Sequence, residues 1–407
     1  MIAASRLTAG RLRAAGAAIG ATAAAILVAA CAAAPTVEDT PAFRIEPLSF
    51  SGAPGSAQMR LAVQDDRAYL SFIESSPERD SAQFLLVERT PSASSPFGPP
   101  QTIVGGTNLV VNAADVPSIL PLSNGTIVAQ WLQTHGDDPE AYDLRLATSS
   151  DGGRTWGPPS TPYRDTSESQ HGFASMFETP GGGFGLVWLD GRSGDEMALR
   201  STSFSANGAQ SEDVAIDPRV CECCQTAVSV AGGSPIAVFR DRSADEIRDI
   251  AIARLESGGW SSPTAVHPDH WKIEGCPVNG PAVSASGQDV VVSWFSQNHV
   301  FVSFSTDAGR TFGPAIRVDD AESQGRVQVE RLDDGSAAVS WVDFPSGRSQ
   351  FRVRRVLPSG KRGPAATIAE GMGTEYPRMV RRGGELLFAW AENADGTTRV
   401  RTARAPL

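Results

Sequence analysis

The feature that most constrains the fold of this chain is a short apolar run that ends in an aromatic residue and occurs seven times. The aromatic residues are Phe72, Trp131, Trp188, Phe239, Trp294, Trp341 and Trp390. Successive copies lie 47 to 59 residues apart, a period that is typical of small antiparallel sheets arranged around an axis. The seven copies predict an all-β protein, a seven-bladed β-propeller.

Each copy lies within the same order of strands, which predicts an up-and-down meander in every unit. A short strand precedes the strand that ends in the aromatic residue, and a third strand, a tight turn and a brief fourth strand follow. The fifth unit shows this order at 282–284, 290–294, 300–305 and 315–318. The last unit has no fourth strand of its own, and the strand at 43–50 has no partner. Because a closed ring leaves no sheet edge exposed, we expect this N-terminal strand to complete the last blade.

Length and charge narrow the class of protein. At 407 residues the chain is longer than most single domains, but closed all-β repeats reach this length as one unit. We therefore expect one domain over 43–407. The 35 basic residues are scattered among 46 acidic ones and the formal net charge is -11, so we expect no broad electropositive face and no nucleic-acid partner.

The first 30 residues have the layout of an export signal. Three arginines precede an apolar stretch over 15–30: Arg6, Arg11 and Arg13. The stretch ends in Val-Ala-Ala-Cys, which resembles the bacterial lipobox, where the signal is cut before a cysteine that receives lipid. The resemblance implies a lipoprotein signal peptide over 1–30, lipidation of Cys31 and a tether over 31–42. The alternative is ordinary cleavage at small residues, with Cys31 as an unmodified thiol.

The residue after Cys31 is alanine rather than the aspartate that retains lipoproteins elsewhere. We therefore expect an anchor in the outer membrane of a Gram-negative cell envelope, with the protein on its periplasmic side or its surface. The lipid would be the protein's only contact with the membrane.

Two predicted turns carry the same pattern, Ser-x-Asp-x-Gly-x-x-aromatic. Its residues are Ser149, Asp151, Gly153 and Trp156 in the first copy, and Ser305, Asp307, Gly309 and Phe312 in the second. In such a turn a short carboxylate accepts backbone N–H bonds, glycine takes a positive φ and the aromatic ring packs between strands. We interpret both turns as structural and exclude Asp151 and Asp307 as catalytic acids.

The two turns match the Asp-box of BNR repeats, and with the propeller period they make the chain resemble the sialidase-like β-propellers over 43–407. The resemblance implies that the Asp-box turns lie on the face opposite the active site. The top face would then carry the connections from second to third strands and the links between blades, where ligands usually meet a propeller. Sialidases have six blades, which is the alternative count here.

Four cysteines and all five histidines fall in these predicted top connections. They are Cys221, Cys223, Cys224 and Cys276, with His135, His171, His267, His270 and His299. Three interpretations of the cysteines are open. They form two disulfides in an exported protein; they bind copper or zinc, with Cys276 or His270 completing the ligands; or they have a redox or free-thiol role. The neighbouring pair Cys223 and Cys224 can close only a strained ring, which favours a role beyond ordinary bridging.

The family resemblance also implies an enzyme hypothesis. Sialidases hold a sugar carboxylate with three arginines, use a tyrosine nucleophile primed by a glutamate, and protonate the leaving group with an aspartate. The candidates for these roles are Arg44, Tyr376, Glu375 and Asp241. Arg44 lies in a Phe-Arg-Ile segment like the family's Phe-Arg-Ile-Pro, but Glu46 interrupts it, and the motif around Tyr376 is absent. The structural alternatives are an exposed edge-strand charge for Arg44 and a packed phenol for Tyr376.

The sequence therefore supports two function hypotheses. The first is an exported, lipid-anchored propeller that acts as a cell-envelope binding or interaction module, with a Cys- and His-bearing site on its top face and a glycan or an envelope protein as partner. The second is an exo-α-sialidase-like glycoside hydrolase that acts on anionic or envelope glycans. We favour binding over catalysis.

Overall fold

The computed structural model describes residues 41–407 apart from 77, 79, 90–96, 137, 139–140, 195, 373–375 and 395. The predicted export signal over 1–30, the lipidation site Cys31 and the candidate residue Glu375 lie outside the described residues, as does most of the predicted tether over 31–42. In the described part of the chain, no helix has the length and apolar character needed to cross a bilayer.

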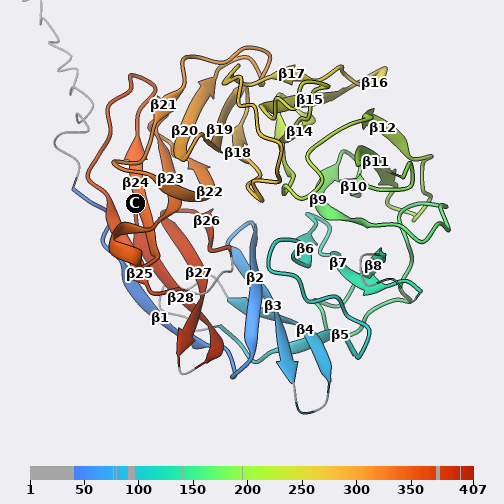
Figure 1. The fold of residues 1–407 in the computed structure, drawn as a ribbon. Helices are drawn as coiled ribbons and strands as arrows, with labels where there is room; N and C mark the ends of the chain where they lie inside the picture. Colours follow the sequence, from blue (N-terminus) through green and yellow to red (C-terminus); the bar gives the residue numbers. More distant parts are fainter. Residues whose placement is uncertain are drawn as a thin grey trace, which may run out of the picture. The chain divides into compact units, whose positions relative to one another are not determined.

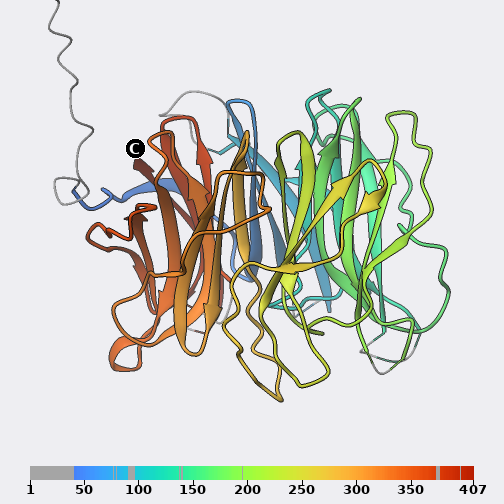
Figure 2. The same ribbon diagram turned by 90° about the horizontal axis from the view of Figure 1, so that it is seen from above.

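The described chain folds into seven small antiparallel sheets arranged as the blades of a β-propeller (Figure 1). This arrangement confirms the all-β class and the count of seven blades rather than six. The view from the side shows the strands running between the two faces of the ring (Figure 2).

The first three blades follow the predicted meander with one exception. Blade 1 comprises β2 (Ser56–Gln64), β3 (Arg67–Ser76), β4 (Ser81–Arg89) and β5 (Gln101–Gly106); blade 2 comprises β6 (Ser118–Pro121), β7 (Ile127–Thr134) and β8 (Tyr142–Ser149); blade 3 comprises β9 (His171–Thr179), β10 (Gly183–Asp190), β11 (Ala198–Phe204) and β12 (Val214–Asp217). In blade 2 an isolated bridge between Leu146 and Ser160 takes the place of a fourth strand.

The next three blades keep the same order. Blade 4 comprises β13 (Ala227–Ala231), β14 (Ser234–Arg240), β15 (Ile250–Glu256), β16 (Gly259–Trp260) and β17 (Thr264–Ala265); blade 5 comprises β18 (Ala282–Ser286), β19 (Asp289–Ser296), β20 (His299–Ser305) and β21 (Ile316–Arg317); blade 6 comprises β22 (Ser323–Arg331), β23 (Ala337–Asp343), β24 (Gln350–Val356) and β25 (Ala366–Glu370), with a 3₁₀ turn, η3 (Pro345–Gly347), before β24. In blade 4 the outer strand is divided, because β16 and β17 both pair with β15.

Blade 7 joins the two ends of the propeller. It comprises β26 (Arg378–Arg382), β27 (Glu385–Ala394), β28 (Thr397–Pro406) and, from the other end of the chain, β1 (Glu46–Ser51). The antiparallel pairing of β1 with β28 places Glu46 opposite Arg404 (Figure 1). The prediction that the N-terminal strand completes the last blade is therefore confirmed.

The recurring aromatic residue packs each blade against the one before it. Trp341 of blade 6 belongs to one cluster with Val291 and Val302 of blade 5, and Phe72 of blade 1 packs with Val400 of blade 7 across the closure. Trp131, Trp188, Trp294 and Trp341 are at most 2% exposed. Because every interface between blades needs one large apolar side chain on the second strand, the aromatic residue recurs once per blade.

The two Ser-x-Asp-x-Gly turns lie after the third strands of blades 2 and 5. Asp151 accepts hydrogen bonds from the backbone N–H groups of Arg154 and Thr155 at 3.0 and 2.9 Å and from the Thr155 hydroxyl at 2.7 Å, and Asp307 makes the same set. The bond from the Thr155 hydroxyl contributes most to lowering the pKa of Asp151, to about 2. All the bonds of both carboxylates are within the turn, at the ends of the blades away from the second-to-third connections.

Candidate functional site

A channel pocket of about 250 Å³ is lined by the innermost strands of all seven blades. One lining residue from each blade, in chain order, is Arg60, Ser118, Ser175, Ala227, Ala282, Arg326 and Arg378. Three of the seven are arginines. The channel wall therefore combines three guanidinium groups with apolar side chains such as Leu61, Ile119 and Val283.

A second pocket of about 590 Å³, which we call the mouth, adjoins the channel at the top face. Its walls come from links between blades and from the β19–β20 connection. The apolar lining residues are Trp271, Ile273, Pro277, Val278 and Phe295, and the amide-bearing ones are Asn112, Asn279, Asn298 and Gln324. Arg326 and Tyr376 line both pockets, so they mark the junction between them.

Irregular backbone at the top of β22 places Arg326 at this junction. The register of β22 shifts at Gly325, and Arg326 has a φ of 54°. Its backbone N–H donates to Asn279 Oδ1 at 2.8 Å. A Cβ at residue 325 would lie 2.4 Å from the same oxygen, and φ there is +77°, so this position requires glycine.

The guanidinium groups of Arg378, which is 3% exposed, and of Arg60, a half-buried residue whose Nε is covered, have little negative charge around them. The pKa of Arg60 is lowered to about 10 by burial, against which Asp115 acts. The pKa of Arg378 is lowered well below its usual value by burial and then by the charge of Arg60, while the Tyr376 phenol acts in the opposite direction. Arg60 Nε and Arg378 Nη2 have no hydrogen-bond partner among the described residues. Two buried cations thus face one pocket with donor capacity unused.

Tyr376 lies between two of the arginines. The guanidinium carbon of Arg326 is 5.0 Å from the centre of its ring and that of Arg378 is 5.8 Å away. The phenol is 7% exposed and donates a hydrogen bond to the carbonyl of Val278. Burial raises the pKa of Tyr376 despite Gln225 and the two arginines. The tyrosine is therefore held as a neutral hydrogen-bond donor.

Two carboxyl groups near the channel have raised pKa values. Asp115 is 1% exposed and accepts from the Phe173 backbone N–H at 2.8 Å; burial raises its pKa to about 7. Glu330 lines the channel and accepts from the Ser284 hydroxyl at 3.1 Å; burial raises its pKa to about 7 as well. Both carboxyls are therefore partly protonated near neutral pH, which leaves the guanidinium charge less balanced.

No protein-family model and no curated protein sequence matches this chain. Solved structures do match it: the polysaccharide lyase Uly1 has a TM-score of 0.52 at 11% identity, over 90% of this chain and 94% of that one. A mutant of the sialidase NanB from Streptococcus pneumoniae has a TM-score of 0.48 at 10% identity, over 84% and 83%. An alpha-L-arabinanase from Penicillium chrysogenum has 0.49 at 13% identity, over 90% and 97%. In fold, this chain is a seven-bladed β-propeller similar to Uly1. At these identities the likeness extends to the fold alone.

The three catalytic candidates that lie within the described residues do not come together in the propeller. Tyr376 lines the channel, but Arg44 precedes the outermost strand of blade 7, where its side chain is 84% exposed and pairs with Glu46. Asp241 bridges to Val220 at the top of blade 4 and lines neither pocket. Burial, and then the charge of Asp217, raise the pKa of Asp241 to about 6. Arg44 has the surroundings of an edge-strand charge because β1 lies on the outside of its blade.

Four cysteines, Cys221, Cys223, Cys224 and Cys276, form one cluster beside the mouth. Their Sγ atoms all lie within 4.8 Å of one another. The structure joins Cys221 to Cys224 and Cys223 to Cys276, with Cα atoms 5.6 and 6.3 Å apart, which suits disulfides. Cys221 and Cys224 are buried. Two links that are 53 residues apart in the chain, before blades 4 and 5, are thus held together.

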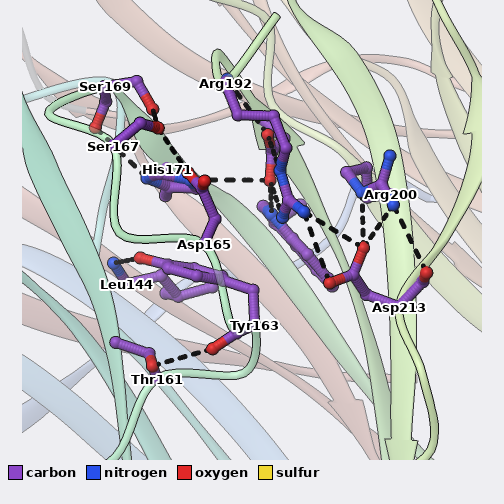
Figure 3. A network of polar contacts seen from close by, with 12 residues as sticks. Leu144, Thr161, Tyr163, Asp165, Ser167, Ser169, His171, Arg192, Arg200 and Asp213 are labelled. Atoms are coloured by element: carbon purple, nitrogen blue, oxygen red, sulfur yellow. Dashed lines mark hydrogen bonds and ion pairs between the residues drawn. The ribbon is translucent and has the colours of Figure 1, made fainter.

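Four of the five histidines pair with carboxylates of their own, and no histidine belongs to the cysteine cluster. The pairs are His135 with Asp143, His171 with Asp165 and Asp190, His267 with Asp269, and His299 with Asp319. Figure 3 shows the surroundings of His171, whose ring stacks on Tyr163 with centroids 4.1 Å apart and whose carboxylate neighbours connect it to Arg192. His270 is exposed and is not one of the grouped ligand atoms. The structure therefore brings together the four cysteines without His270.

Sequence reasoning does not find Arg60, Arg326 or Asp115 as site residues. A usable signal is an arginine within the first strand of a unit, since that strand lies innermost and half of its side chains face the axis. Arg60, Arg326 and Arg378 share this position, but only the closed ring brings them to one pocket.

Proposed function

We propose that this protein is an exported, lipid-anchored β-propeller of the cell envelope that binds glycans through an acidic group on a sugar. The acidic group, a carboxylate or a sulfate, would be held by Arg60, Arg326 and Arg378 at the junction of channel and mouth. The rest of the sugar would occupy the mouth.

The observation that carries this proposal is the unbalanced charge in the channel. Arg378 is 3% exposed, and the charge that lowers its pKa, after burial, is that of Arg60, another cation. Buried ions are ordinarily paired, because an uncompensated charge destabilises the fold. The chain as a whole carries a formal charge of -11, so these cations are a local exception rather than part of a basic surface. An anion bound between them would supply the missing charge and accept from the unused donors.

The lining of the mouth suits the remainder of a sugar. Trp271 packs edge-on against Phe295 with ring centroids 5.7 Å apart, which gives an apolar wall for a pyranose face. The amides of Asn112, Asn298 and Gln324 offer donors and acceptors for hydroxyl groups. The mouth is larger than the channel, so a ligand would enter with its acidic group first.

Anchoring follows from the N-terminal sequence. The apolar stretch that ends at Cys31 supports export and lipidation, and the residues up to the first strand would serve as a tether. A propeller anchored in this way would lie among the glycans of the cell envelope.

The test is isothermal titration of the purified full chain with 3′-sialyllactose, a glucuronate disaccharide and a sulfated disaccharide, each beside its neutral counterpart. We expect at least one acidic sugar to bind and the neutral counterpart to bind at least about 30-fold more weakly, since an unpaired buried charge costs about 2 kcal/mol or more. Arg378→Met should abolish the difference. Arg381→Met is the matched control, because Arg381 lies on the same strand but pairs with the exposed Asp333. Equal binding of acidic and neutral sugars, or equal effects of the two variants, would reject the proposal.

A glycoside hydrolase of sialidase type is a second candidate, favoured by the position of Tyr376 between Arg326 and Arg378. The raised pKa of Tyr376 and its bond to a backbone carbonyl argue for binding instead. Release of the aryl group from an aryl sialoside by the full chain, lost in Tyr376→Phe, would favour the hydrolase.

A further inference from the structure

The four cysteines of the cluster meet around one point. Cys221 Sγ and Cys276 Sγ belong to different pairs, and they are 3.9 Å apart. No two of the four sulfurs are more than 4.8 Å apart. Three of the cysteines lie within four residues and the fourth comes from the next link, so the chain offers four sulfurs to one centre, as a metal site needs.

The spacing agrees with tetrahedral coordination by sulfur. Zinc–thiolate bonds of about 2.3 Å place the sulfurs of a regular tetrahedron about 3.8 Å apart. The separation of 3.9 Å between Cys221 Sγ and Cys276 Sγ, which belong to different pairs, is close to this edge, and the two joined pairs would have to be reduced and move apart to reach it. Four thiolates without an oxygen or nitrogen ligand form the donor set that selects Zn²⁺ over harder divalent ions.

A buried cation lies beside the cluster. Arg248 Nη1 donates to Cys221 Sγ at 3.6 Å, and the Arg248 side chain is 1% exposed. The same guanidinium contacts Glu222 at 2.8 Å and Glu246 at 3.1 Å. A disulfide sulfur carries no charge, whereas a tetrathiolate zinc centre is anionic and is stabilised by N–H donors around its sulfurs. The Arg248 contact is therefore the kind of outer contact that such a centre uses.

We propose that Cys221, Cys223, Cys224 and Cys276 bind one Zn²⁺ ion as a closed, structural tetrathiolate site. Coordination releases the four thiol protons and leaves no open position, so the ion has no catalytic role. Disulfides and zinc compete for the same sulfurs, and the reduced chain takes the metal.

The site would organise the mouth. Cys276 is followed by Pro277, Val278 and Asn279, which line it, and Cys224 is followed by Gln225, whose Oε1 accepts from the Gly280 backbone N–H at 3.0 Å. Zinc would thus fix the two links that form one wall of the pocket. This inference does not depend on which ligand the mouth takes.

The test is metal analysis and a peptide map of the full chain purified without oxygen and without chelator. We expect about one zinc ion per chain by plasma mass spectrometry. After alkylation in denaturant with chelator, trypsin should release the peptides 220–240 and 273–310 separately, with all four cysteines alkylated. Peptides joined by a disulfide, together with less than a tenth of an equivalent of zinc, would overturn the proposal. This map is read on the unsubstituted protein, so it does not depend on the folding of any variant.

Two variants assign the ligands. Cys276→Ser should lower the zinc content of the purified protein at least fivefold. His270→Asn should leave it unchanged, because His270 is exposed and asparagine tolerates its φ of 53°. Loss of zinc in His270→Asn, or full zinc in Cys276→Ser, would refute the four-cysteine assignment. The sugar titrations are separate measurements, so failure of either proposal can be distinguished from failure of the other.

Discussion

Replacing Arg60 by methionine should make the ligand-free protein more stable, although it removes the contacts of the guanidinium group with the channel wall. Methionine keeps the length of the side chain and removes its charge. Arg60 lies on the innermost strand of blade 1, enclosed by protein except where it faces the channel. The carboxyl of Asp115 acts on it as a counter-charge, but that carboxyl is itself partly protonated near neutral pH.

The magnitude follows from the pKa. The pKa of Arg60 falls from 12.5 to about 10 in the folded protein, and each pKa unit corresponds to about 1.4 kcal/mol. Below pH 10 the guanidinium is charged in both states, so the folded state bears the full cost of about 3 kcal/mol. Contact with channel water reduces this figure, and we expect Arg60→Met to raise the free energy of unfolding by about 2 kcal/mol at pH 7.

The assay is thermal unfolding at pH 7 in chloride and in sulfate of equal ionic strength. In chloride, the midpoint of Arg60→Met should exceed that of the wild type by a few degrees. Sulfate should stabilise the wild type more than the variant, because an anion between Arg60 and Arg378 relieves their repulsion. The shift in unfolding midpoint that sulfate causes in Arg381→Met measures the effect of sulfate that does not depend on Arg60, and the shifts of the other proteins are compared with it. A variant less stable than the wild type, or an equal response to sulfate in both, would refute the reasoning.

Two further perturbations address the channel carboxyl and the closure. Burial raises the pKa of Asp115 from 3.8 to about 7. The stability that the protonated carboxyl contributes is therefore full below pH 3.8 and is lost as the pH rises through 7, by about 4 kcal/mol. In Asp115→Asn, the free energy of unfolding by urea should depend less on pH between pH 4.5 and 8, with the remaining dependence due to Glu330; an unchanged dependence would contradict the assignment. At the closure, Arg89 is fully buried and its Nη1 lies 2.7 Å from a carboxylate oxygen of Glu385 in blade 7, so Arg89→Met should lower the free energy of unfolding by about 3 kcal/mol. The control Arg67→Met removes a cation that is 60% exposed and should lower it by at most about 1 kcal/mol. Equal losses of stability in thermal unfolding would show that burial at the closure is unimportant.

The seven recurring aromatic residues allow the number of blades to be predicted from the sequence, because each interface between blades buries one such side chain in the same position. Phe72 and Trp341 each pack against strands of the preceding blade, at distant points of the ring. The pairing of β1 with β28 was predictable from the sequence as well. The last repeat had no fourth strand, and the N-terminal strand belonged to no repeat. Local turn chemistry around Asp151 and Asp307 needs only a few neighbouring residues, so it too is written in the sequence.

The site itself was decided by tertiary structure. Arg60, Arg326 and Arg378 are more than fifty residues apart from one another in the chain. Their place in the first strand of a unit is a local signal, but it does not show that they share a pocket; closure of the ring brings their strands to one axis. The candidate Arg44 was attractive for its neighbours in sequence, but the outer position of β1 turns it to solvent.

The sequence alone determined what depends on short-range pattern: the repeat, the blade meander, the two turns and the grouping of cysteines in the links before blades 4 and 5. Tertiary structure alone decided which charges are buried together, because desolvation and Coulomb interaction depend on distance in space rather than along the chain. Arg378 illustrates the difference: its burial and its proximity to Arg60 give it a role that its place in the sequence does not reveal.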